Sequence, residues 1–481
     1  MITFVAYAAL VLFTAAYFWC GRVLYRRTND VSIPIGLALI YYWTFAGAWF
    51  FIGDAALGFE GYRIGLGYYY LMQKMFPFVM NGNYLLALGA YALFATGLLG
   101  TLLLLVPRGV RTTPALVRLD HRYMLIGGLL CMLFSVIIAL PWLQEAWRNG
   151  EPFYTALRKH TTYLATLRAW ADRGAALCFV FGYAIMLGSG DRRSFFDDRA
   201  RPWHRVAYPV AMLTLGVYLS LLGDRHTLFA VLILTTIFLL DRYRRRGLRL
   251  AAIPVIMIVL LLAFGGWVRG YTPQGVKPSI DTSPFTLSRI AHVPRQQVGL
   301  LRKAGNTVLG NEMFAAHFSM FGILEREVSV EPWISLRYLG CCVGLCRDDG
   351  LPTPSVYDHY ADAAHLDPSQ GYTIHHASGW YLNFGWAGLP IGGAFLGLLW
   401  GGMIRVRVHT SARSRYRVLT LMLPYLLVSY LPPLLRSGPE AYWGVGIEGI
   451  LMPMTILVLA SALNWPWKRE VLPVAMEHSP A

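Results

Sequence analysis

Three ionisable side chains, Asp224, Arg225 and His226, stand together in the stretch LLGDRHTLF. An apolar run ends just before them, at 206–222, and another begins with them, at 226–240, so no polar loop accommodates this corner. Ionisable groups at such a depth are costly unless they are paired or face a wet cavity, and they commonly mark functional sites. A guanidinium is always charged and binds phosphate oxygens in pairs, so Arg225 is a candidate anion ligand. The structural alternative is a mutual Asp224–Arg225 pair that reaches water.

Two further arginines border apolar runs in the same way. Arg436 lies in LPPLLRSGPEAYW, a short hairpin that also carries Glu440, and Arg269 follows an apolar run in GGWVRGYT. Taken alone, the charges of the hairpin, Arg436 and Glu440, are explained by a local ion pair. Arg269 is explained by a side chain that extends along the apolar surface to water. Three arginines at one membrane face would together suit a phosphate-rich headgroup.

A pair of histidines, His375 and His376, precedes a glycine-rich apolar segment that opens with WYLNFGWAG. Histidine titrates near neutral pH and can take a proton from a hydroxyl, so either residue is a candidate general base, as is Glu440. The aromatic residues of this opening, Tyr381 among them, are typical of an interfacial belt, and the glycines are typical of close helix packing. The nearby histidines and aspartates match no specific metal-site spacing, so we predict neither a metal nor another cofactor.

The elements that position these residues are predicted from the apolar blocks. The chain has 481 residues, is 56% hydrophobic and only 14% charged, and its apolar residues fall in uninterrupted blocks. A membrane core of about 30 Å takes roughly 20 helical residues, and about eleven blocks approach that length. We therefore predict an all-α polytopic membrane protein, with spans at 3–20, 32–53, 84–106, 123–143, 172–189, 206–222, 226–240, 250–266, 379–404, 417–435 and 443–462.

The placement of arginine predicts the orientation in the membrane. The net charge is +16, and more than half of the 42 lysines and arginines fall in short connections after alternate spans. The positive-inside rule makes these connections cytoplasmic, with the N-terminus periplasmic and the C-terminus cytoplasmic. The basic surplus is then a topology signal, and nucleic acid is not an expected partner.

The longest polar segment divides the chain into three parts. Residues 1–266 hold the first eight spans, 267–378 form a large periplasmic loop, and 379–481 hold the last three spans and a short cytoplasmic end. The loop is rich in turns and aromatic residues and includes stretches compatible with short helices, so we expect it to be structured and the chemistry to face outside. Its cysteines, in CCVGLC, permit a disulfide.

The order of these features resembles the Wzy-type oligosaccharide repeat-unit polymerases of bacterial surface polysaccharides, including O-antigen and enterobacterial common antigen polymerases. The likeness rests on LLGDRHTLFAVLI, SGWYLNFGWAGLPIGGAFLGLLWGG and LLRSGPEAYW, with the long loop between the first two. It implies a GT-C-like architecture and an inner-membrane glycosyltransferase without nucleotide sugar or metal. Members move a growing glycan from its undecaprenyl diphosphate carrier onto a new lipid-linked repeat unit, on the way to lipopolysaccharide or exopolysaccharide.

The resemblance also implies roles for residues. Arg225 matches the arginine of the family's mid-chain turn and Arg436 that of its last outer hairpin, while Arg269 matches a basic residue before the long loop. His376 has no counterpart that can be aligned and joins the two arginines as a candidate catalytic residue on its chemistry. The candidate substrate-binding residues are Arg269, Arg289, His226, His375, Tyr381, Asn383 and Glu440. The expected partners are the lipid-linked donor and acceptor, the bilayer, a chain-length regulator and a flippase.

Two other functions fit parts of the pattern. A surface-polysaccharide ligase would share the fold, the arginines and a histidine-bearing outer loop, and would differ in its acceptor. A lipid-linked oligosaccharide flippase would use charges within the membrane for its pathway. The long outer loop and the odd number of predicted spans favour an enzyme over this transporter.

Overall fold

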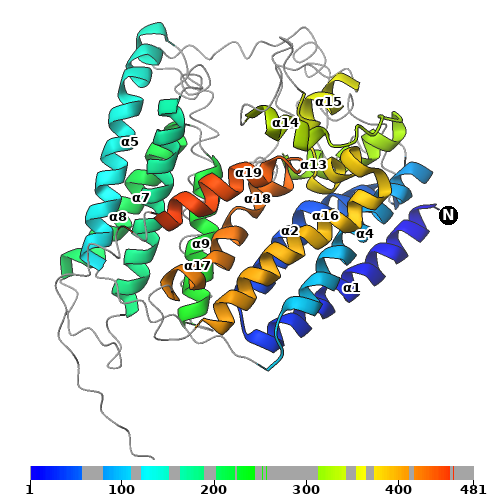
Figure 1. The fold of residues 1–481 in the computed structure, drawn as a ribbon, viewed down its shortest axis with the longest axis horizontal. Helices are drawn as coiled ribbons and strands as arrows, with labels where there is room; N and C mark the ends of the chain where they lie inside the picture. The colour runs from blue at the N-terminus through cyan, green and yellow to red at the C-terminus, as the bar shows by residue number, and fades with distance from the viewer. Residues whose placement is uncertain are drawn as a thin grey trace, which may run out of the picture.

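The computed structural model describes most of the apolar blocks and part of the long loop. The described residues are 2–56, 80–109, 121–150, 163–188, 202–222, 225–243, 252, 256, 312–342, 354–363, 373–410, 417–455 and 459. Helices are the regular secondary structure of this part of the chain (Figure 1). They are α1 (Ile2–Thr28), α2 (Ser32–Ala56), α4 (Gly82–Leu105), α5 (His121–Asn149), α7 (Tyr163–Gly188), α8 (Pro202–Leu221), α9 (Arg225–Tyr243), α13 (Glu312–Glu325), α14 (Ile334–Cys342), α15 (Val356–Ala363), α16 (His376–His409), α17 (Arg417–Ser429), α18 (Leu431–Leu435), α19 (Ala441–Gly444) and the π-helix η1 (Val445–Leu451).

The helices coincide with the predicted spans. Every predicted span except 250–266 overlaps a described helix, and 250–266 lies outside the described residues apart from positions 252 and 256. Four helices, α1, α4, α5 and α16, are long and apolar enough to cross a membrane. The described part of the chain is therefore all-helical, with several long apolar helices that indicate a multi-pass membrane protein.

Two groups of helices lie side by side (Figure 1). In the first group α16 packs along α4, with α1 and α2 beside them and α13 against α2 and α4. The second group is α5, α7 and α8. Between them, α9 contacts α7 and α17, and α17 contacts α16. We call the end of the bundle where α16 begins, near α13, α14 and α15, the outer end, and the end where α1 meets α2 the inner end.

Glycines set the separation of α4 and α16. A Cβ on Gly393 would lie 1.9 Å from the carbonyl oxygen of Phe94, and one on Gly397 would lie 2.8 Å from that of Leu98. On the other helix, a Cβ on Gly97 would lie 2.3 Å from the carbonyl oxygen of Pro390. Small residues let helix backbones approach closely in membranes, where no hydrophobic effect draws helices together. The close packing predicted for the glycines of the segment that opens with WYLNFGWAG is confirmed at Gly393 and Gly397.

A break at Gly385 divides α16, which corrects the prediction of one continuous span over 379–404. Gly385 has φ 61° and ψ −148°, a left-handed conformation that favours glycine. The chain doubles back there, so that a Cβ on Gly388 would lie 2.2 Å from the carbonyl oxygen of Trp380. The backbone carbonyl of Leu382, three residues before the break, accepts from the N–H of Glu331 at 2.9 Å. The piece beyond the break still runs for roughly 36 Å, enough to cross a membrane.

A buried ion cluster holds the inner end together. Arg407 of α16 donates to Asp30, between α1 and α2, at 3.0 Å, and its other terminal nitrogen lies 3.5 Å from a carboxylate oxygen of Asp241 in α9. Its guanidinium carbon also lies 4.3 Å from the ring centroid of Tyr425 in α17. The side chain of Arg407 is 1% exposed. This arginine belongs to a stretch predicted to be a basic surface connection, and it instead joins four elements of the core.

Candidate functional site

The last hairpin docks on the start of α16 at the outer end. Gly379 lies so close to it that a Cβ there would be 2.6 Å from the Cα of Gly438. Glycine is needed at position 379 because the atom that its Cβ would meet is backbone, whereas a Cβ on Gly438 would lie 2.5 Å from a carboxylate oxygen of Glu440, the end of a flexible side chain. The contact brings two predicted site stretches, the one with the paired histidines and the one with Arg436, onto each other.

His376 connects α16 to this hairpin. Its Nδ1 donates to the carbonyl oxygen of Ser437 at 2.9 Å, and its Nε2 lies 3.1 Å from the hydroxyl of Tyr442. The indole N–H of Trp380 donates to the same Nε2 at 3.1 Å. A carbonyl only accepts and an indole N–H only donates, so the ring is neutral, with its proton on Nδ1. His376 is fully buried, and in this arrangement its bonds hold the hairpin against α16.

His375 is the N-cap residue of α16. Its Nδ1 accepts from the backbone N–H of Ala377 at 3.1 Å, so the proton is on Nε2, which lies 3.1 Å from the hydroxyl of Thr44 in α2. The ring packs edge-on against Tyr91 of α4, with 4.7 Å between centroids. His375 is 0% exposed and both of its ring nitrogens are bonded, so it joins α2, α4 and α16 inside the bundle.

A third buried histidine, His317 of α13, was not singled out by the sequence analysis. Its Nδ1 donates to the carbonyl oxygen of Thr44 at 2.6 Å, and its Nε2 accepts from the hydroxyl of Tyr84 at 3.0 Å. Its ring stacks on Tyr91 at 5.3 Å. The sequence feature that could have pointed to a buried histidine is the apolar run around it, AAHFSMFGIL, inside an otherwise polar loop. That run buries α13 in the bundle and makes this part of the loop a component of the core.

We expect acid to destabilise the protein partly through His317. Burial lowers the pKa of His317 from about 6.5 to about 4. The unfolded chain then takes up a proton that the folded protein excludes, so stability is lost as the pH falls from about 6.5 toward 4. Thermal unfolding of the purified protein in detergent between pH 7.5 and 5 measures this loss. His317→Gln should flatten the pH dependence, and an equally steep curve in the variant would contradict the assignment.

Asn383 ties α14 to the first piece of α16 and to the hairpin. Its Oδ1 accepts from the backbone N–H of Ser335 at 3.0 Å, and its Nδ2 donates to the Ser335 hydroxyl at 2.9 Å and to the Gly379 carbonyl at 2.8 Å. The hydroxyl of Ser335 in turn donates to a carboxylate oxygen of Glu440 at 2.7 Å. Burial raises the pKa of Glu440, although the bond from Ser335 acts in the opposite direction. The network therefore holds a carboxyl group of raised pKa at the outer end.

The predicted arginines are described only in part. Arg436 is the C-cap of α18 and is half-buried. Arg225 is the first residue of α9, and its side chain, like that of His226, lies outside the described part of the structure. Arg269 and Arg289 lie outside it entirely. Because α9 and α18 contact each other, the two corners that carry Arg225 and Arg436 belong to neighbouring elements.

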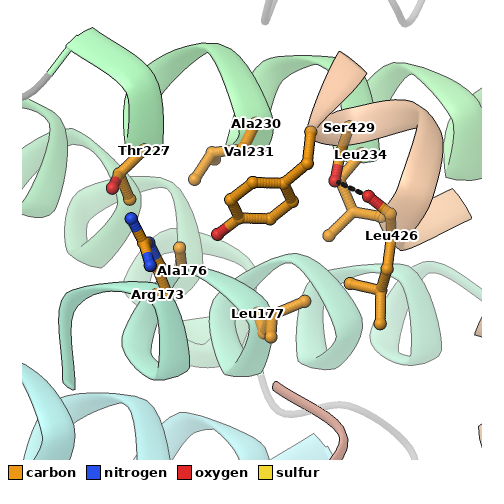
Figure 2. A pocket seen from close by; sticks show the side chains of 10 residues that line it. Arg173, Ala176, Leu177, Thr227, Ala230, Val231, Leu234, Leu426 and Ser429 are labelled. Atoms are coloured by element: carbon orange, nitrogen blue, oxygen red, sulfur yellow. Dashed lines mark hydrogen bonds between the residues drawn. The ribbon is translucent and has the colours of Figure 1, made fainter. Parts of the chain in front are cut away.

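A narrow crevice lies near the start of α9, between α7, α9 and α17 (Figure 2). Its cavity volume is about 20 Å³, room for about one water molecule. Thr227, the third residue of α9, lines it together with Ser429 and Tyr430. Arg173 of α7 also lines it, on the same side as Thr227, with its guanidinium carbon 5.5 Å from the ring centroid of Tyr430. Arg173 is not among the residues predicted from the sequence, although a charge just inside the predicted span 172–189 is a recognisable signal.

Aromatic side chains cover the surface near the break in α16. Tyr381 is half-buried and packs edge-on against Trp386, which is 42% exposed, with 5.6 Å between ring centroids. Trp333, the residue before α14, is also exposed and packs edge-on against Phe384, with 4.9 Å between ring centroids. Trp333 has φ 65°, an uncommon conformation for a bulky residue. These rings suit either the edge of a bilayer or the face of a sugar.

The outer loop contains a disulfide bond, which its cysteines permit. Cys341, at the end of α14, is disulfide-bonded. The cysteines described in the spans, Cys20, Cys131 and Cys178, are free thiols. Among the residues that the structure describes, no group of three or more histidine, cysteine or carboxylate side chains could hold a metal ion.

The fold and this site together define a helical, multi-pass type of membrane protein with a polar cluster at one end. The cluster joins histidines, a carboxyl group and an arginine-bearing hairpin to the start of α16. No protein-family model, curated protein or solved structure matches the chain.

Proposed function

We propose that the protein is an inner-membrane glycosyltransferase that polymerises undecaprenyl-diphosphate-linked oligosaccharide repeat units on the periplasmic side. The observation that carries this proposal is the convergence at the outer end. The Arg436 hairpin lies against the start of α16 through Gly379 and His376, and α18 contacts the helix that begins with Arg225. Arg225, His376 and Arg436 are candidate residues because of their chemistry, and they are far apart in the sequence. They thus lie in adjoining elements at one end of an apolar bundle.

The orientation and the number of spans belong to the same proposal. We infer about eleven spans, a periplasmic N-terminus and a cytoplasmic C-terminus from the arginine-rich connections. The outer end then faces the periplasm, where a flippase delivers lipid-linked repeat units and a chain-length regulator can act. The acceptor is the non-reducing end of a new repeat unit, still attached to its own carrier.

The side chains of the protein can supply every group that the reaction needs. A hydroxyl oxygen of the acceptor sugar forms a bond to the anomeric carbon of the donor glycan, while the bond from that carbon to the carrier diphosphate breaks. The diphosphate leaves with the bonding electron pair, and fixed guanidinium groups such as those of Arg225 and Arg436 stabilise this charge. The acceptor hydroxyl gives its proton to a general base.

Glu440 is better placed than His376 to be that base. His376 is fully buried with both ring nitrogens bonded, whereas Glu440 is half-buried in the outer hairpin. The raised pKa of Glu440 brings its proton affinity closer to neutral pH, where general bases work best. We assign His376, His375 and Asn383 to positioning, and Tyr381 with Trp386 to contact with sugar faces.

Arg436→Ala is expected to abolish elongation while the protein remains folded. The purified protein is given a lipid-linked repeat unit in detergent with a chelator present, and the products are resolved by chain length. The wild type should form longer lipid-linked chains, and Arg436→Ala should lower the rate at least about a hundredfold, the scale of losing one transition-state charge contact. Arg148→Ala, an exposed arginine at the end of α5, is the matched control and should elongate normally.

Other outcomes distinguish the competing functions. Transfer of the glycan to a lipid A core acceptor, with no growth of lipid-linked chains, would identify a ligase. Movement of the lipid-linked unit across liposomes without elongation would identify a flippase. Normal chain ladders in Arg436→Ala would remove the hairpin arginine from the mechanism.

A further inference from the structure

We propose that Arg27 and Arg108 form a binding site for the headgroup phosphate of an anionic phospholipid at the inner end of the bundle. Arg27 belongs to the last turn of α1, and Arg108 lies in the bend that follows α4. Figure 1 shows α1 and α4 ending at the same side of the first helix group. The site lies at the opposite end of the molecule from the candidate functional site, so the inference does not rest on the proposed function.

The side chain of Arg27 is held against α4. It is half-buried, and its Nη1 donates to the backbone carbonyl of Leu103 at 2.5 Å. This bond uses one N–H of the guanidinium, and within the described part of the chain no other hydrogen bond or ion pair engages the rest. Arg27 therefore has a fixed position and N–H groups to spare.

Arg108 is exposed, and the backbone on both sides of it is constrained. Proline restricts φ at Pro107, and Gly109 has φ 76°, a left-handed conformation that favours glycine. Among the residues that the structure describes, no hydrogen bond, ion pair or ring contact engages the side chain of Arg108. The bend thus presents a guanidinium group without a protein partner.

The two guanidinium groups are held near each other without a counter-charge. They are close enough for their like charges to repel each other. The carboxylates described at this end are those of Asp30 and Asp241, and both lie against Arg407. A phosphate between Arg27 and Arg108 would replace this repulsion with charge-assisted hydrogen bonds to both guanidinium groups.

The surrounding surface indicates that the phosphate belongs to a lipid. Leu104, next to the carbonyl that holds Arg27, is 86% exposed, so the lipid-facing surface of α4 continues up to the two arginines. On α1, exposed Trp19 shares a helix face with exposed Arg22 and Arg26, a combination typical of the headgroup level of a membrane. A clustered positive charge at this level attracts anionic lipids in preference to zwitterionic ones.

Lipid titration of the full-length protein in detergent tests the proposal. The probes are anionic phosphatidylglycerol, zwitterionic phosphatidylethanolamine and soluble glycerol phosphate, and their affinities follow from the rise in thermal unfolding temperature with ligand concentration. Arg108→Gln is expected to weaken phosphatidylglycerol binding about tenfold or more, the scale of losing hydrogen bonds to a charged group. Without lipid, this variant should unfold at the wild-type temperature, because it removes a repulsion and no contact.

Arg405→Gln is the matched control. Arg405 is an exposed arginine of α16 at the same end, so this variant removes the same charge from the same leaflet. It should weaken phosphatidylglycerol binding by less than about twofold, since exposed charges outside a defined site contribute little. A loss as large as that of Arg108→Gln would show a diffuse attraction to the basic surface and overturn the proposal.

Arg108→Glu tests the pair of charges directly. The carboxylate would supply Arg27 with an anion from the chain itself, so the lipid-free variant should unfold at or above the wild-type temperature and gain no stability from phosphatidylglycerol. Stabilisation of this variant by phosphatidylglycerol as large as that of the wild type would contradict the site.

Three further outcomes overturn the proposal. Undiminished phosphatidylglycerol binding in Arg108→Gln removes this arginine from the site. Equal affinity for phosphatidylethanolamine shows that the anionic headgroup is not recognised. Glycerol phosphate that binds as tightly as phosphatidylglycerol shows a site for a free anion, without a contribution from the lipid.

Discussion

Replacing Gly393 by alanine is expected to prevent α16 from packing on α4, and to leave little folded protein. A Cβ at this position would lie 1.9 Å from the carbonyl oxygen of Phe94, which belongs to a helix backbone and cannot rotate away. Overpacking in a core costs roughly 1–3 kcal/mol when side chains can adjust, and a clash with backbone costs more. The measurement is the yield of monodisperse protein in detergent and its thermal unfolding temperature.

Gly402→Ala is the matched control for this variant. It lies in the same helix, and a Cβ there meets no atom within 4 Å. Alanine is also the better helix former, so the control should be as stable as the wild type or slightly more so. Equal stability of Gly393→Ala and Gly402→Ala would contradict the close α4–α16 contact.

Arg407→Met is expected to destabilise the inner end strongly. The substitution leaves the carboxylates of Asp30 and Asp241 near each other in the core without their cation. Removing one partner of a buried ion pair typically costs roughly 3–5 kcal/mol, because the remaining charge stays buried and uncompensated. Thermal unfolding in detergent measures the loss, and low expression of folded protein is its expected counterpart in cells.

The control is Arg405→Met, which removes an exposed arginine two residues earlier in the same helix. It should unfold at the wild-type temperature. Combining Arg407→Met with Asp30→Asn removes one of the stranded carboxylates, so the double variant should recover part of the loss. A double variant that is less stable than Arg407→Met alone would show that the two residues do not act as a pair.

The sequence was sufficient to predict the helices, because membrane spans are read from the length and composition of single apolar blocks. The blocks around Gly82–Leu105 and His121–Asn149 needed no knowledge of their neighbours. The close packing of the glycines was also predictable, since small residues at a spacing of four mark a helix face. The break at Gly385 was not, because a glycine inside a glycine-rich span gives no sign of which one leaves the helix.

Contacts between distant residues were beyond a reading of one sequence. Asp30 and Arg407 are separated by 377 positions, and each lies in a stretch that a surface loop would explain equally well. His317 fell in the long loop, whose helix α13 could be assigned to the bundle only once its partners in α2 and α4 were known. The paired histidines were found as chemistry, and their burial by Thr44, Tyr91 and the hairpin emerged from the fold.

The break at Gly385 makes the outer segment of α16 a separate module. It is held by Ser335, by the hairpin at Gly438 and by the bond from His375 to Thr44, whereas the long piece beyond it packs on α4 and carries the Arg407 cluster. Substitutions in the outer loop can therefore reshape the surface around Asn383 while the transmembrane scaffold keeps its geometry.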